Sequence, residues 1–96
     1  MVTLEECANS VLVRNSNYTL NMKFNSVKEA KDYVYRTINF AKSHIGKSMN
    51  GHQVKSVSNN KFYTFEWDNN IHHVISWTVY YENGNSKYSA TITEEK

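Results

Sequence analysis

The chain has no proline, and its 96 residues include only three glycines and one cysteine. A single cysteine excludes a disulfide within the chain, which is typical of proteins in a reducing compartment. No apolar run approaches the roughly 20 residues that a membrane-spanning helix needs. The N-terminal residues include Glu5 and Glu6 and lack the apolar segment of a secretory signal. We therefore expect a cytoplasmic protein with no membrane association.

The remaining composition predicts one small domain that covers residues 1–96. Aromatic residues make up 14% of the chain, which is enough for a hydrophobic core without metal or disulfide support. The net charge of +2 is too small to indicate nucleic-acid binding by itself. Abundant asparagine, lysine and serine beside so little proline and glycine suggests an AT-rich genome, such as that of a phage, a Gram-positive bacterium or a mobile element.

The dipeptide Asn83-Gly84 predicts a β-hairpin, because both central residues of a type I′ turn need positive φ. Apolar residues alternate on both sides of it, so the turn and the hydrophobic pattern agree on which side chains share a face. With Asn83 and Gly84 at the centre of the turn, the pairs predicted on the core face are Val79–Tyr88, Trp77–Ala90 and Ile75–Ile92.

Two further strands are expected before this hairpin. The segment 62–67 alternates, and a three-residue loop at 68–70 would turn it so that Tyr63, Phe65 and Trp67 face the core. A weaker strand is expected at 54–58. Together these segments predict a four-stranded antiparallel meander.

The clearest helix signal starts at Ser26, which forms a capping-box pattern with Glu29. Apolar residues then recur at helical spacing, and Gly46 suits the position just after the helix. The apolar stripe consists of Val27, Ala30, Val34, Ile38, Ala41 and Ile45. A strand is expected at 18–24 before it, and a second capping box, Thr3 to Glu6, predicts a short N-terminal helix.

These elements predict an α+β fold of two layers, in which one long helix packs on an antiparallel β-meander. The expected order is α-β-α-β-β-β-β. The strand–helix–meander part resembles the cystatin-like architecture. Cystatins carry a Gln-x-Val-x-Gly turn, and the segment 53–57 here retains only Gln53 of that motif. The resemblance is therefore one of element order, and it implies no inhibitory residues.

No motif in the sequence indicates catalysis, a cofactor or a metal, so we expect a protein that is not an enzyme. Gly46-Lys47-Ser48 resembles the end of a phosphate-binding loop, but it follows a helix rather than opening one. His72 and His73 point to opposite faces of a strand and cannot bind one ion together. His44 and His52 flank one loop and leave a metal-dependent hydrolase as a third alternative, although no cysteine, aspartate or glutamate lies near them in sequence. Cys7 has no neighbouring histidine.

Two surfaces remain as candidates for binding a partner. The first is the sheet face turned away from the helix, which is poor in charge and carries aromatic anchors, as protein interfaces do. Its candidate residues are Phe62, Val74, Ser76, Thr78 and Tyr80. The second is the outer side of the long helix, where basic residues alternate with an aromatic one, as in helices that contact phosphates. Its candidates are Lys28, Lys31, Tyr35, Arg36, Lys42 and Lys47.

We therefore expect a small non-catalytic module that binds another protein through its sheet, as a phage or mobile-element modulator or inhibitor of a host protein would. Homodimerisation through a sheet edge or the sheet face is a further expectation. The alternative is a nucleic-acid-binding module that uses the basic helix face.

Overall fold

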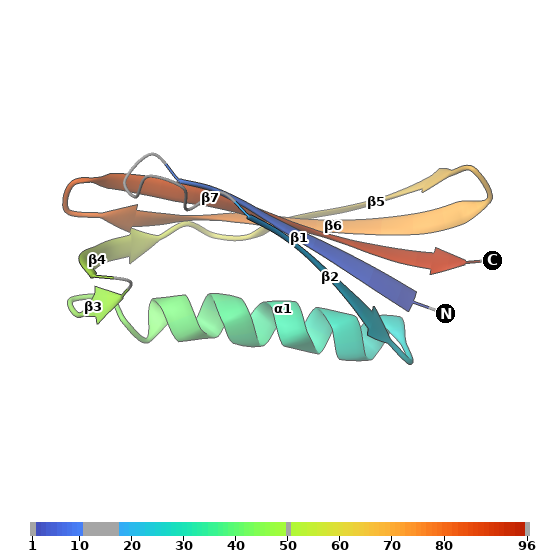
Figure 1. Cartoon of the computed structure of the whole chain (residues 1–96), viewed down its shortest axis with the longest axis horizontal. Helices are drawn as coiled ribbons and strands as arrows, with labels where there is room; N and C mark the ends of the chain where they lie inside the picture. Colours follow the sequence, from blue (N-terminus) through green and yellow to red (C-terminus); the bar gives the residue numbers. More distant parts are fainter. Residues whose placement is uncertain (1, 11–17, 50, 96) are drawn as a thin grey trace.

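The computed structural model describes residues 2–10, 18–49 and 51–95. Strands make up 64% of it, and they form an antiparallel sheet that is curled into a half-barrel against a single short helix (Figure 1). The predicted fold class, a long helix packed on a β-meander with α-β-α-β-β-β-β order, is therefore wrong. The observed order is β-β-α-β-β-β-β-β.

The sheet has the strand order β2-β1-β7-β6-β4-β3, and β5 pairs with β6 beside that path. Of the four strands expected to form a meander, only β5, β6 and β7 do so in the described part of the chain. β4 does not pair with β5, because both pair with the same edge of β6. The strands are β1 (Val2–Ser10), β2 (Tyr18–Phe24), β3 (Ser48–Met49), β4 (His52–Val57), β5 (Lys61–Trp67), β6 (Asn70–Tyr81) and β7 (Gly84–Glu95). The helix is α1 (Val27–Lys42).

The largest difference from the sequence prediction is β1, which replaces the expected N-terminal helix. Val2, Leu4 and Ala8 are buried on one face of β1, while Thr3 and Glu5 are exposed, so burial follows the period of two that a strand requires. β1 pairs with β2 on one side and with β7 on the other. These two ladders hold the segment extended despite its capping-box pattern, because tertiary pairing outweighs local helix propensity.

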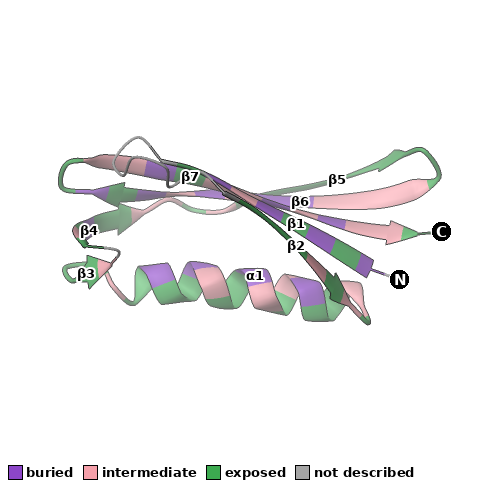
Figure 2. Cartoon of the chain, in the orientation of Figure 1, coloured by how far each residue is buried: buried purple, intermediate pink, exposed green. Residues whose placement is uncertain are grey.

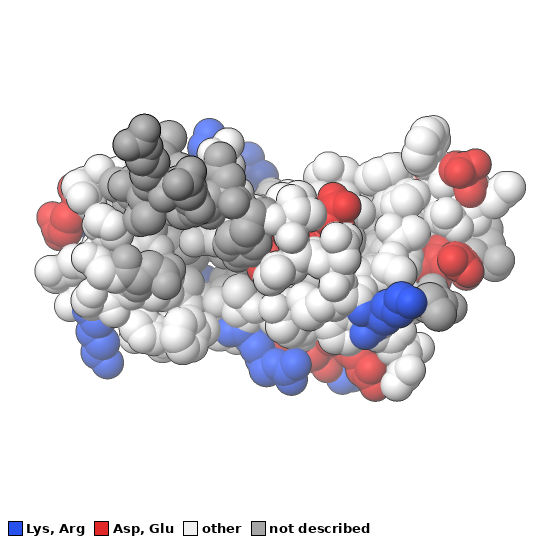
Figure 3. Space-filling model, viewed as in Figure 1, with Lys and Arg blue, Asp and Glu red and all other residues white. Residues whose placement is uncertain are grey.

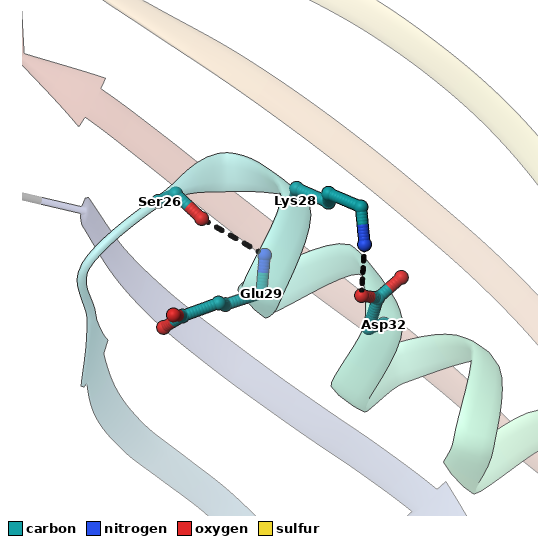
Figure 4. A network of polar contacts seen from close by, with 4 residues as sticks. All are labelled: Ser26, Lys28, Glu29 and Asp32. Carbon is teal, nitrogen blue, oxygen red and sulfur yellow. Dashed lines mark hydrogen bonds and ion pairs between the residues drawn. The ribbon is translucent and has the colours of Figure 1, made fainter.

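The predicted start of the helix is confirmed. Ser26 is the N-cap, and its hydroxyl accepts a hydrogen bond from the main-chain N–H of Glu29 at 3.1 Å (Figure 4). The Glu29 carboxylate accepts from the N–H of Asn25, one residue earlier than in a standard capping box. The predicted end is wrong, because the C-cap is Ser43 and Gly46, at φ 84°, lies three residues beyond it.

The core lies between α1 and the inner face of the sheet (Figure 2). The buried side chains of α1 are Ala30, Val34, Ile38 and Ala41, which confirms most of the predicted apolar stripe. Ile45 is the exception, because it lies after the helix, is 48% exposed, and forms a parallel bridge with Val54. From the sheet, the core receives Val2, Leu4, Val54, Ile75, Trp77, Val79, Tyr81, Ala90 and Ile92.

The β6–β7 hairpin keeps the predicted faces but changes the partners. Tyr81 pairs with Gly84, so the two turn residues are Glu82 and Asn83, one position earlier than expected. Moving the turn by one residue shifts the pairing by two, and a shift of two leaves every side chain on its face. Trp77 therefore faces Tyr88 instead of Ala90, and the two rings stack with centroids 5.3 Å apart.

The β5–β6 hairpin, in contrast, slips by one residue relative to the prediction. Trp67 pairs with Asn70, so the loop has two residues, and both Asp68 (φ 55°) and Asn69 (φ 61°) have the positive φ of a type I′ turn. A slip of one residue exchanges the two faces of a strand. Tyr63, Phe65 and Trp67 consequently lie on the outer face of the sheet rather than in the core.

Candidate functional site

The candidate site lies on the face of the sheet turned away from α1, which we call the open face. Its side chains do not pack into the core between the sheet and α1. The strand registers place alternate residues on it. In β5 to β7 they are Lys61, Tyr63, Phe65, Trp67, His72, Val74, Ser76, Thr78, Tyr80, Asn85, Lys87, Ser89, Thr91, Thr93 and Glu95. β1 adds Thr3, Glu5, Cys7 and Asn9, and β2 adds Thr19, Asn21 and Lys23.

Three aromatic side chains of the open face stand in a row along β5 and form what we call the aromatic ridge: Tyr63, Phe65 and Trp67. Their exposed fractions are 56%, 42% and 69%. Every residue of β5 is exposed (Figure 2). Large aromatic side chains bury about 150–250 Å² each when they are covered. An exposed row of three in so small a domain is typical of an interaction site.

The ridge is ordered by stacking on its neighbours. The rings of Tyr63 and Phe65 lie 6.1 Å apart, and that of Phe65 lies 4.9 Å from the ring of His72 on β6. His72 is itself held by Thr93, whose hydroxyl lies 3.1 Å from Nδ1. The Trp67 ring lies 6.5 Å from that of His72. The ridge therefore loses less rotamer freedom on binding than three independent side chains would.

The five residues predicted to bind a partner are divided by the sheet. Ser76, Thr78 and Tyr80 lie on the open face as expected, and Tyr80 is 41% exposed. Val74 is on the same face but is only 8% exposed. Phe62 is on the other face, opposite Ile75, so its predicted position is wrong as a consequence of the one-residue slip in β5.

Phe62 instead attaches β5 to the helix side of the sheet. Its ring stacks on that of His73 at 6.3 Å, and Nζ of Lys31 lies 4.7 Å above it, in the geometry of a cation–π contact. In the same cluster, Nδ1 of His73 lies 3.3 Å from the hydroxyl oxygen of Thr64. Burial, followed by the charge of Lys31, lowers the pKa of His73.

The open face is also hollowed, next to Lys61 at the start of β5. Two shallow depressions of about 320 and 310 Å³ adjoin one another there, and both are lined by Ser76, Lys87 and Tyr88. The larger one extends to Lys61 and Tyr80, while the smaller one reaches Cys7 and Ser89. The hollow contains hydroxyl groups and two ammonium groups, with no carboxylate among its lining residues, so it suits hydrogen-bonding and anionic groups of a partner.

The basic residues predicted on the helix are partly engaged within the domain. Lys28 forms an ion pair with Asp32 at 2.9 Å (Figure 4). Lys31 lies over the ring of Phe62. Tyr35, Arg36 and Lys42 are exposed on α1, and Lys47 is exposed after it. In Figure 3, acidic atoms interrupt the basic ones along the edge of the molecule where α1 lies.

The histidines do not converge on a metal site. His44 Nδ1 lies 2.7 Å from the carbonyl oxygen of Phe40, and the two rings are tilted by 40° with their centroids 4.4 Å apart. The ring of His52 instead meets that of Tyr81 edge-on, with centroids 6.0 Å apart. Among the described residues there is no group of three or more histidine, cysteine, aspartate or glutamate side chains that could hold a metal ion.

In the same part of the chain, no helix is both long and apolar enough to cross a membrane.

A second hollow lies between α1 and the sheet, with a volume of about 150 Å³. It is lined mostly by apolar side chains, namely Thr37, Phe40, Ala41, Met49, Trp77, Val79 and Tyr88. Burial raises the pKa of Tyr88 to about 12, and the neighbouring Tyr81 adds to this effect. The cavity contains no nucleophile with an adjacent base, so its chemistry is that of apolar packing.

Sequence reasoning missed the aromatic ridge because it assigned these side chains to the core. The signal was present in Asp68-Asn69, since two adjacent residues that tolerate positive φ favour a two-residue turn over a three-residue loop. Comparisons with protein-family models, curated proteins and solved structures find no match to this chain.

Proposed function

We propose that this chain is a non-catalytic protein-binding domain whose contact surface is the aromatic ridge and the adjoining hollow of the open face. The observation that carries the proposal is the exposure of Tyr63, Phe65 and Trp67 side by side on one strand. Binding hot spots are enriched in tryptophan and tyrosine that fill pockets of a partner. The ammonium groups of Lys61 and Lys87 line the hollow. They favour a partner that carries an acidic or phosphate-bearing segment next to the pocket that receives the ridge.

We further propose that the domain modulates or inhibits a larger host protein, as a phage or mobile-element factor would; small size and composition support this role. The nucleic-acid alternative has less support, because Lys28 is paired with Asp32 and Lys31 packs on Phe62. The ion pair offsets one positive charge of the helix, and the contact with Phe62 holds a second ammonium group against the sheet.

The proposal is tested by comparing the wild-type protein with a Phe65→Ala/Trp67→Ala variant as immobilised bait in a nuclease-treated lysate. The matched control is Phe40→Ala, which removes an aromatic ring of 59% exposure from α1. We expect the partner captured by wild type and by Phe40→Ala to be lost with the double variant, with an affinity reduced about tenfold or more.

Because both ridge residues are exposed, the double variant should keep the wild-type unfolding temperature, which excludes unfolding as the cause of lost binding. A partner retained equally by the double variant would refute the proposed surface. Capture that disappears after nuclease treatment, together with an electrophoretic shift abolished by Lys42→Glu/Lys47→Glu, would favour the nucleic-acid alternative.

A further inference from the structure

β5 is an edge strand whose outer side has no partner among the described strands. It pairs with β6 alone, through seven consecutive residues without a bulge. It contains no proline, and four of its seven side chains are aromatic. Bulges, proline and short length are three of the features that prevent an edge from pairing with another chain, and β5 lacks them. Its charged side chains are Lys61 and Glu66.

The register identifies which main-chain groups of β5 point outward. Trp67 and Asn70 flank a two-residue turn, so they exchange both hydrogen bonds of a closely spaced pair. Thr78, farther along the same edge of β6, agrees with this pattern. Its N–H donates to Ser58 Oγ, and its carbonyl oxygen accepts from the N–H of Ser58. Even-numbered residues of β6 therefore bond toward β5, and the odd-numbered residues of β5 bond toward β6.

It follows that the N–H and C=O groups of Phe62, Thr64 and Glu66 point away from the sheet. These three positions are symmetric about Thr64. An antiparallel copy of β5 placed with Thr64 opposite its own counterpart brings Phe62 opposite Glu66 of the second copy. All three outward positions then form closely spaced pairs, which complete the hydrogen bonding of this edge.

The side chains of β5 are also complementary to themselves in this register. On the open face, Tyr63 lies opposite Phe65 of the second copy, in a pair without main-chain bonds between its members, where side chains approach most closely. Lys61 lies opposite Trp67 of the second copy, where a cation–π contact can form. On the helix face, Glu66 of the second copy lies beside Phe62, whose ring is already covered by the ammonium group of Lys31.

We propose that the protein forms a two-fold symmetric homodimer by antiparallel pairing of β5 with β5 of a second copy, centred on Thr64. The dimer joins two half-barrel sheets through one continuous edge and places two aromatic ridges next to each other on its open face. A C2 interface requires a patch that is complementary to itself. β5 meets this requirement in hydrogen bonding and aromatic pairing, and Lys31 of α1 supplies the positive charge for Glu66 of the second copy. Of the other two edge strands, β3 has only two residues, and β2 has only Leu20 as a large exposed apolar side chain within residues 19–24.

The dimer is independent of any other partner, so its failure would leave the proposed binding function untouched. It is measured on the purified full chain by sedimentation equilibrium over a range of concentrations. We expect a reversible monomer–dimer equilibrium for the wild type. A wild type that remains monomeric up to millimolar concentration would overturn the proposal.

Charge exchange tests the interface itself. Lys31→Glu places a carboxylate beside Glu66 of the second copy, and Glu66→Lys places an ammonium group beside Lys31, so each variant alone should dimerise roughly tenfold more weakly than the wild type. An equimolar mixture of the two variants restores opposite charges at both contacts, and we expect it to recover the dimer. A mixture no stronger than either variant alone would contradict the assigned register.

Amide hydrogen exchange provides a residue-specific readout that does not depend on substitutions. Protection of the N–H groups of Phe62, Thr64 and Glu66 should increase with protein concentration, while that of Tyr63 and Phe65, already bonded to β6, should stay constant. Dimerisation without this pattern would assign the interface to another surface and refute the pairing of β5.

Discussion

The rings of Phe65 and His72 stack across β5 and β6, with centroids 4.9 Å apart and planes 19° apart. This pairing exists because the β5–β6 turn has two residues and not three. The same turn brings Phe65 to the open face, exposes the aromatic ridge, and sends Phe62 to the helix side. One residue of register in this hairpin thus decides which aromatic side chains are available to a partner.

The turn itself gives the first prediction. Asn69 adopts φ 61°, a conformation that costs most residues other than glycine about 1–2 kcal/mol. We expect Asn69→Gly to increase the free energy of unfolding slightly and Asn69→Val to decrease it by about 1 kcal/mol. Urea denaturation measures both. Asn59→Val, in the exposed connection between β4 and β5, is the control and should change little; an equal loss at both positions would argue against a strained turn.

The helix start gives the second prediction. Ser26→Ala removes the hydroxyl that accepts from Glu29 N–H, and we expect it to lower the free energy of unfolding by about 1 kcal/mol. Ser26→Asp retains an acceptor at the N-cap and should remain close to wild type. Chemical denaturation followed by circular dichroism distinguishes them, and equal stabilities of the two variants would show that the cap contributes nothing.

Tyr88 gives the third prediction, which concerns alkaline pH. Burial raises its pKa in the folded state to about 12, above the usual value of 10.0. The folded state therefore holds this proton more tightly than the unfolded state. The resulting stabilisation is fully present below pH 10 and is lost as the pH rises from 10 to about 12.

Tyr88→Phe isolates this effect, because it removes the ionisable hydroxyl and keeps the ring that stacks on Trp77. We expect the stability of wild type to fall more steeply above pH 10 than that of Tyr88→Phe in denaturation experiments at matched pH. Titration of the tyrosinate absorbance should also lose its most alkaline step. Parallel pH profiles for the two proteins would contradict the assignment.

Several features were predictable because they depend on local chemistry or on the period of two. Ser26 begins the helix through its own hydroxyl, and β2 follows from the alternation of residues 18–24. The inner face of the β6–β7 hairpin, with Ile75, Trp77 and Val79 buried, survived a shift of the turn because the shift in pairing was even. In each case the information lies within a few neighbouring residues.

Tertiary structure alone decided the rest. Residues 2–10 carry a helix-start pattern, and they become a strand only because β2 and β7 provide ladders on both sides. Three further features also depend on partners distant in sequence: the C-terminal end of α1, the separate pairing of β4 and β5 with β6, and the side taken by Phe62. The sequence by itself determined where apolar and polar residues alternate in strands and where the helix begins. Only long-range pairing determined which side of the sheet the aromatic residues of β5 would occupy, because a single residue of register reverses it.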